Sequence, residues 1–142
     1  MSIYDAQLNN KSNRGVKQYT DLDLFFGKKS SDRDVSEVSD IQAVKRSIRN
    51  LVLLNTYEKP FHPEISSGIQ QYLFDPMNDV SVKLIEKSVE TIIQKYEPRV
   101  DLVGVVAEPD YDRNSYTVTV EFYVVNAPTE LVDLTIFLER LR

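Results

Sequence analysis

Cysteine is absent from this 142-residue chain, and histidine occurs once, as His62. Without cysteine there is no disulfide framework, no thiolate zinc site and no cysteine nucleophile. A catalytic triad or a histidine-ligated metal would have to use His62, which sits between prolines and is read as a turn residue. The four glycines stand apart at positions 15, 27, 68 and 104, which excludes a glycine-rich phosphate loop. We therefore expect no metal and no cofactor.

Long apolar runs are also missing. No stretch approaches the roughly 18 apolar residues of a membrane span. Residues 1–18 are polar and lack the apolar region of a secretory signal. With 17 basic against 22 acidic residues the net charge is -5, which argues against nucleic acid as a partner. We expect no membrane, no nucleic acid and no small-molecule substrate among the partners.

The composition that remains is that of an ordinary folded domain, with 42% hydrophobic and 27% charged residues. The length suits one domain rather than two. Residues 1–18 have few apolar side chains and are predicted to form a flexible N-terminal arm. Residues 19–142 are predicted to form a single domain.

Two segments have the three- and four-residue apolar spacing of amphipathic helices. The first is predicted from about residue 40 to about residue 54, with Ser39 and Gln42 at the spacing of a capping box. The second is predicted from about Asp79 to Glu97, because Pro98 disfavours helical backbone at the preceding residue. Between them we expect a proline-rich loop, a short helical turn after Gly68, and an N-cap at Asp75–Pro76.

Alternating apolar residues predict strands on both sides of the helices. The predicted strands are 20–26 (with Leu22, Leu24 and Phe26 on one face), 100–107, 115–125 and 133–139, and a hairpin turn covers 110–114. Helices followed by a run of strands indicate an α+β fold. We expect two main helices packed on one face of a small, mainly antiparallel sheet.

Paired carboxylates are the one enzymatic possibility, since a glycosidase needs two of them at a defined separation. The candidates are Glu64, Glu97, Glu108, Asp110 and Asp112. No spacing singles out a pair, so no catalytic residue is predicted and the chain is not expected to be an enzyme.

The triplet Glu97–Pro98–Arg99 ends the second helix and opens a strand. Proline fixes the direction in which the chain leaves the helix, and it places an acid and a base on a rigid corner. Rigid corners suit partner binding because little side-chain entropy remains to be lost. The alternative is a helix terminator with a local ion pair, which contributes little when exposed.

The last predicted strand places Leu134, Ile136 and Leu138 inward. A strand at a sheet edge exposes unpaired N–H and C=O groups, which are a hazard unless another strand is added to them. The same applies to the N-terminal strand. Strand pairing with another chain is therefore a candidate function of this segment.

Several of these features together resemble the baseplate wedge protein family of contractile-tailed phages, which also includes a baseplate component of type VI secretion systems. The resemblance covers roughly residues 40–140. It is carried by Lys59-Pro-Phe-His-Pro-Glu64, Gly68–Ile69, Leu73–Phe74 and the helix that ends in Tyr96-Glu-Pro-Arg-Val100. The chain departs from the family pattern in its long N-terminal extension and in His62, where an acidic residue often stands. Some members are called tail lysozymes, although the family role is structural.

The resemblance implies a virion protein of the tail baseplate, assembled in the host cytoplasm. It implies that Glu97, Pro98 and Arg99 dock on a helical core bundle of other baseplate wedge subunits. It further implies that the sheet exchanges strands with the tail sheath protein and so initiates sheath assembly. A tail lysozyme that cleaves peptidoglycan and the equivalent secretion-system component remain the alternatives.

Overall fold

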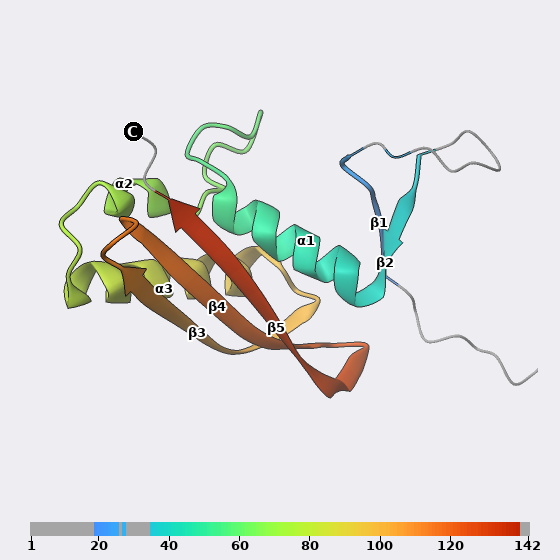
Figure 1. Ribbon diagram of the computed structural model, residues 1–142. Coiled ribbons are helices and arrows are strands. Elements are labelled where there is room, and N and C mark those ends of the chain that lie inside the picture. The colour runs from blue at the N-terminus through green and yellow to red at the C-terminus, as the bar shows by residue number, and fades with distance from the viewer. Residues whose placement is uncertain (1–18, 26, 28–34, 140–142) are drawn as a thin grey trace, which may run out of the picture.

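The computed structural model describes residues 19–25, 27 and 35–139. The predicted flexible arm, residues 1–18, lies outside the described residues, and so does Phe26. Figure 1 shows a three-stranded sheet with helices against it and a separate small hairpin beyond the first helix. Helices and strands occupy comparable parts of the chain, which confirms the α+β class. Among the described residues no helix is both long and apolar enough to cross a membrane.

The first main helix, α1, spans Asp40–Leu53, close to its predicted bounds. Its apolar face is buried as expected, at Val44, Ile48 and Val52. Ser39 is the N-cap residue, but its side chain makes no capping hydrogen bond, so the predicted capping box does not form. Burial of the apolar face, rather than this cap, accounts for the position of α1.

The second main helix, α3, spans Asp79–Tyr96 and ends where the proline rule placed its end. Its N-cap is Asn78, whose side-chain oxygen accepts a hydrogen bond from the Ser81 N–H at 2.8 Å. The N-cap of α3 is therefore Asn78, three positions after the predicted Asp75. Between the two main helices lies the short helix α2, Ile69–Leu73, which Gly68 starts with a left-handed φ of 62°.

The main sheet has the order β3-β4-β5, and both pairs are antiparallel. Its strands are β3 (Val100–Asp110), β4 (Ser115–Val124) and β5 (Ala127–Glu139), so β3 and β5 are longer than the sequence predicted. The central strand β4 alternates as expected. Its inward residues are all buried, namely Tyr116, Val118, Val120, Phe122 and Val124.

One hydrophobic core joins the inward side of the sheet to α1, α2 and α3. α3 contacts mainly β3, while α1 contacts α3 and β5, so the two main helices share one face of the sheet, as predicted. The core centres on Ile48, Ile85, Ile93, Phe122 and Ile136, each at most 1% exposed. No described helix lies on the opposite face.

The N-terminal strand differs from its prediction. It is short, β1 (Thr20–Leu22), and it pairs with β2 (Glu37–Ser39) in a two-stranded sheet of its own. Leu22 and Leu24, which the alternation placed on one apolar face, are 65% and 61% exposed, whereas Asp21 is half-buried. The acidic face of β1 is turned inward because basic side chains of the body bind it, as described next.

Candidate partner-binding corner

The corner between α3 and β3 is held by Glu97 and Arg99. Glu97 caps α3, since its N–H donates to the Ile93 carbonyl at 2.9 Å, and its carbonyl accepts from the N–H of Val100, the first residue of β3. Pro98 is exposed at the tip. The proline prevents the helix from continuing, so the next residue enters the sheet.

Arg99 binds Glu97 in a bidentate manner across Pro98. Nε donates to Oε1 at 2.6 Å and Nη2 donates to Oε2 at 2.9 Å. This fork geometry is the strongest form of a carboxylate–guanidinium pair. Glu97 is only 3% exposed, so its charge depends on these donors.

Two further residues, distant in sequence, complete what we call the corner network: Asp21, Ser47, Glu97 and Arg99. The Ser47 hydroxyl, on α1, donates to Glu97. Arg99 Nη1 donates to both carboxylate oxygens of Asp21, on β1, at 3.1 and 3.2 Å. The network therefore connects the N-terminal hairpin, α1, the end of α3 and the start of β3.

The electrostatics of the network keep both of its main groups charged. Burial by itself raises the pKa of Glu97, but hydrogen bonds from Arg99 and Ser47 outweigh burial and hold that pKa below its usual value. The hydrogen bond to Glu97 in turn raises the pKa of the Arg99 guanidinium. A buried carboxylate that is paired on two sides is a structural anchor, since removing one partner leaves the charge uncompensated.

A second ion pair fastens the hairpin to α1. Arg46 Nη1 lies 2.5 Å from Asp23 Oδ1, and the Arg46 guanidinium also stacks over the Phe25 ring at 5.5 Å. A hydrogen bond from the Phe25 N–H and the contact with Arg46 lower the pKa of Asp23. Asp21 and Asp23, on the first arm of the hairpin, are thus both bound to arginines of the body.

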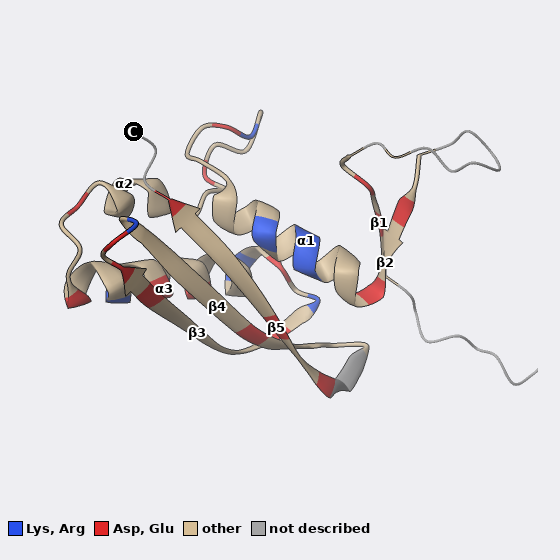
Figure 2. Cartoon of the chain, viewed as in Figure 1, with Lys and Arg blue, Asp and Glu red and all other residues tan. Residues whose placement is uncertain are grey.

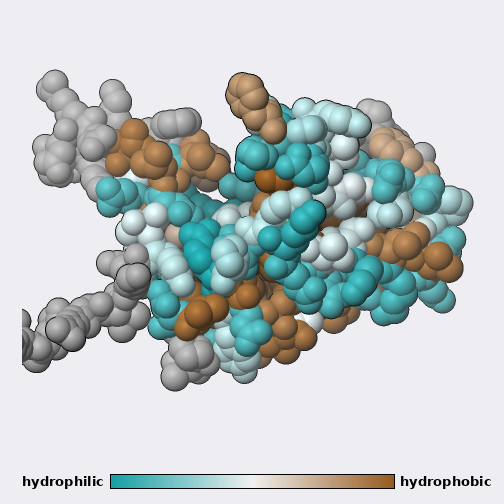
Figure 3. Space-filling model, turned by 180° about the vertical axis from the view of Figure 1, so that it is seen from behind, coloured by the Kyte–Doolittle hydropathy of each residue, from teal (hydrophilic) through white to brown (hydrophobic). Residues whose placement is uncertain are grey.

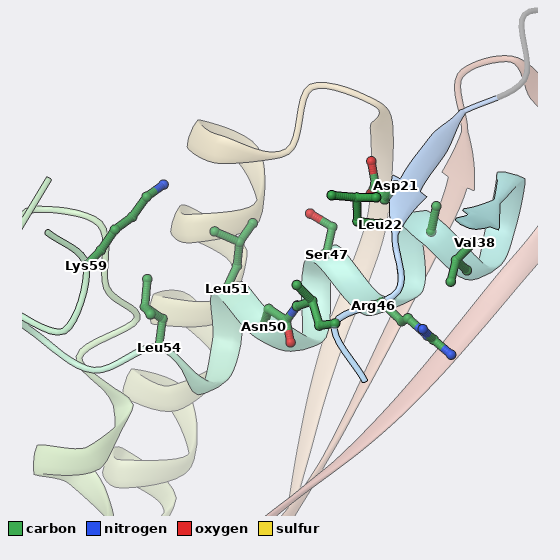
Figure 4. A pocket seen from close by; sticks show the side chains of 11 residues that line it. Asp21, Leu22, Val38, Arg46, Ser47, Asn50, Leu51, Leu54 and Lys59 are labelled. Carbon is green, nitrogen blue, oxygen red and sulfur yellow. The ribbon is translucent and has the colours of Figure 1, made fainter. Parts of the chain in front are cut away.

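A groove of about 600 Å³ lies between the hairpin and α1, next to the corner. In Figure 4, Leu51 of α1 and Leu54, the residue after α1, line one side of it, and Leu22 and Val38 line it from the hairpin. Figure 3 shows apolar surface over this hairpin, where Phe25 is 85% exposed. The corner is therefore flanked by an apolar surface.

The two edges of the main sheet differ. Along β3, the Ala107 N–H is already bound by Glu86 Oε1 at 3.1 Å, Pro109 has no N–H, and the register shifts between Leu102 and Gly104. Along β5, pairing with β4 occupies one side, and no strand among the described residues occupies the other.

The three predicted pairing residues lie on β5, where their side chains point into the core. Ile136 and Leu138 are buried and Leu134 is partly buried. Any strand added at this edge would therefore pair with backbone groups of the segment, while these side chains hold β5 on the body.

The candidate catalytic carboxylates do not assemble into one described site. Glu97 is occupied in the corner network. Glu64 lies on an exposed loop, 3.1 Å from His62 Nδ1, and a backbone hydrogen bond together with His62 lowers its pKa. Glu108 and Asp110 lie on β3, and Asp112 lies in the turn that follows it. No group of three or more potential metal ligands occurs among the residues that the structure describes.

Sequence reasoning placed Glu97, Pro98 and Arg99 together, but it missed Asp21, Ser47 and Arg46. Asp21 is 78 residues from Arg99, and Ser47 is 50 residues from Glu97. The alternation of residues 20–26 did indicate two faces of the N-terminal strand. It could not indicate that the acidic face would turn inward, because that depends on arginines brought close only by the fold.

Comparison with known proteins identifies the family. The family model of the baseplate wedge protein gp25 matches residues 38–129, well over half of the chain. The baseplate wedge protein gp25 of Enterobacteria phage T4 is 28% identical over 115 residues, which are 81% of this chain and 86% of that protein.

Two solved structures share the fold. One is a protein of Geobacter sulfurreducens proposed to be a tail lysozyme, with a TM-score of 0.60 and 23% identity, covering 71% of this chain and 93% of that one. The other belongs to the six-fold symmetrised baseplate of the anti-feeding prophage, with a TM-score of 0.61 and 18% identity, covering 88% of each chain. The sequence match and the shared fold agree: this chain belongs to the gp25 family of baseplate wedge proteins.

Proposed function

We propose that this protein is a structural, non-enzymatic subunit of a contractile phage tail baseplate. It docks on the core bundle of other wedge subunits through the Glu97–Pro98–Arg99 corner, and it initiates the tail sheath by exchanging strands with the sheath protein at β5. It is assembled into the virion in the host cytoplasm. The observation that carries the proposal is the family match over residues 38–129.

The contrast between the two sheet edges supports strand exchange at β5. Edge strands are normally protected against pairing with other chains. β3 has such protection, from Glu86, Pro109 and the register shift. No described strand pairs with the outer side of β5, and β5 is 13 residues long, so it offers an extended ladder.

Proline substitutions at two adjacent positions test this role. In an antiparallel edge strand the N–H groups point alternately toward the neighbour and toward solvent. Of Thr135→Pro and Ile136→Pro, one therefore removes an outward N–H and the other an inward one. We expect the variant that loses the outward N–H, once its fold has been verified by circular dichroism because Ile136 lies in the core, to fail to nucleate sheath on purified baseplates. Full-length sheaths on baseplates that carry this folded variant would contradict the proposal.

The corner supports docking in a specific way. Glu97 is buried and serves to orient Arg99, whereas Pro98 and part of the Arg99 guanidinium remain accessible, beside the exposed Leu22 and Leu24. The contact surface we propose therefore combines one oriented cation with apolar side chains. Such a combination provides both direction and buried apolar area.

Changes at the exposed leucines test docking without disturbing the buried pair. Leu22→Ser and Leu24→Ser should leave the free protein folded, because both side chains are already mostly in water. We expect the double variant to enter the wedge complex at least about tenfold more weakly, which corresponds to about 1.4 kcal/mol. Phe61→Ser is the matched control, since Phe61 is 96% exposed on a loop outside this surface. Equal incorporation of both variants would refute docking at the corner.

Peptidoglycan cleavage is the competing function, suggested by the name of the Geobacter sulfurreducens neighbour. A glycosidase needs a general acid whose pKa is raised. The pKa values of Glu64 and Glu97 are instead lowered. We expect no peptidoglycan turnover above buffer background from the purified protein. Turnover that a single Glu→Gln substitution abolishes would establish an enzyme.

A further inference from the structure

The open face of the main sheet, opposite the helices, carries charge of one sign. Strands β3, β4 and β5 contain no lysine or arginine, and Figure 2 shows acidic residues along them. The exposed carboxylates of this face are Asp101, Glu108, Glu121, Asp133 and Glu139. Within the described residues none of these five forms a salt bridge, in contrast to Asp21, Asp23 and Glu97.

The same face exposes large apolar side chains. Val106 is 53% exposed, Leu131 49% and Phe137 67%. The register places Val106, Thr119 and Thr135 in one row across the three strands, and Phe137 opposite Thr117 in the next row. Apolar side chains among charges of one sign are a composition suited to contact with an oppositely charged protein surface.

One row of the face is unfavourable in the free protein. Glu121 lies directly opposite Asp133, and like charges in such cross-strand positions are destabilising. On the other side of Glu121 the row continues to Gly104, where a Cβ would meet no atom within 4 Å. The two carboxylates therefore stand beside an open space, and nothing in the described fold compensates their repulsion.

We propose that this face binds a basic segment of a protein partner. Lysine or arginine side chains of the segment pair with Glu121 and Asp133, and its aliphatic side chains cover Val106 and Phe137. Successive outward residues of a strand are about 6.8 Å apart, at 3.4 Å per residue. Because only every second residue of an extended partner faces the sheet, a partner whose every second residue is in turn basic and apolar matches this spacing. The site is distinct from the β5 edge, although a strand added there would widen the same face.

The charge of the face and the small number of potential metal ligands favour a basic protein segment over nucleic acid, a second copy of this chain or a metal ion. Nucleic acid would be repelled by the carboxylates. A second copy would also be repelled in general, because each chain has a net charge of -5. A metal ion lacks a third protein ligand among the described residues. An arginine fits best, since a guanidinium can bridge two carboxylates that face each other.

The first test uses a blocked peptide in which every second residue is in turn arginine and valine, with threonine at the positions between them, and glutamate replaces arginine in the matched peptide. We expect the basic peptide alone to bind, with NMR shifts in the isotope-labelled protein confined to the open face. The double variant Glu121→Gln with Asp133→Asn should lose at least about tenfold in affinity. Its melting temperature should not fall, because the variant removes a repulsion.

Asp112→Asn is the matched control, because it removes one exposed carboxylate from the β3–β4 turn, outside the face. Equal loss in this control, binding at another surface, or no binding would overturn the proposal. Calcium ions that produce the same shifts in place of the peptide would also overturn it, by showing a simple cation site.

The second test locates the partner in assembled baseplates. A photo-crosslinking amino acid at Thr135, in the middle of the face, should capture a segment rich in lysine or arginine, whereas one at the exposed Gln71 on α2 should not. A captured segment without basic residues, or no capture in intact baseplates, would contradict the proposal. Sheath nucleation by the Glu121→Gln, Asp133→Asn variant is scored separately, because this variant leaves the β5 backbone intact.

Discussion

Arg99 donates to both carboxylate oxygens of Glu97, at 2.6 and 2.9 Å, although a single proline separates the two residues in sequence. This pair lies where α1, α3, β1 and β3 meet. Within the Glu97–Pro98–Arg99 triplet, the ion pair therefore stabilises the folded domain. Pro98 and the accessible part of Arg99 belong to the protein surface. Any substitution in the triplet has to be assessed for folding before it is assessed for docking.

Removing the guanidinium should therefore destabilise the free protein. Arg99→Ala leaves the buried carboxylate of Glu97 without its main partner, and stranding such a charge costs about 3 kcal/mol. We expect the urea midpoint of the isolated protein to fall accordingly. A midpoint equal to that of the native chain would mean that Ser47 and solvent compensate Glu97 by themselves.

The double variant Arg99→Met with Glu97→Gln tests whether the loss of stability comes from the uncompensated charge of Glu97. In the double variant residue 97 carries no charge, so no buried charge is left uncompensated. We therefore expect the double variant to be more stable than Arg99→Ala alone. Chemical denaturation of the native chain, Arg99→Met, Glu97→Gln and the double variant measures the coupling. Additive losses in the double variant would show that the two side chains act independently.

The stability of the protein should fall in acid because of Glu97. Its folded-state pKa is lowered relative to the ordinary value of 4.5, so the unfolded chain binds the proton more readily. The stabilisation is complete above the unfolded pKa and is lost as the pH falls through the folded pKa. Unfolding at several pH values below about 5 should show a steeper decline for the native chain than for Glu97→Gln. Asp112→Asn serves as an exposed control, and an identical decline in all three proteins would exclude Glu97 as the cause.

The hairpin should detach without unfolding the body. Asp21→Asn and Asp23→Asn weaken its two ionic contacts, to Arg99 and Arg46. Each contact is partly exposed, so each contributes little to the stability of the whole protein. We expect faster amide hydrogen exchange in β1 and β2, with little change in the melting temperature. Unchanged exchange would show that backbone bonds such as the one from Asp40 N–H to the Tyr19 carbonyl hold the hairpin alone.

One buried hydroxyl offers a route to higher stability. Tyr116 is 2% exposed, and its hydroxyl has no hydrogen-bond partner among the described residues. A buried polar group without a partner costs about 1–3 kcal/mol. Tyr116→Phe should therefore raise the free energy of unfolding by about 1 kcal/mol. A loss of stability, measured by urea denaturation, would reveal a bound water as the partner.

The sequence by itself determined those elements whose burial is set by a local pattern. The apolar spacing of α1 and α3 located both helices, Pro98 located the end of α3, and the alternation of β4 gave its inward face. These features were predictable because 3.6- and 2-residue periodicities record which side of an element meets the core.

Tertiary structure decided the features that depend on distant residues. The alternation of residues 20–26 indicated an apolar face with Leu22 and Leu24, yet two ion pairs with Arg99 and Arg46 turn the opposite, acidic side of this strand toward the body. The edge position of β5 and the opposition of Glu121 to Asp133 likewise follow from strand order and register. No local pattern encodes these pairings, because each joins segments that only the folded chain brings together.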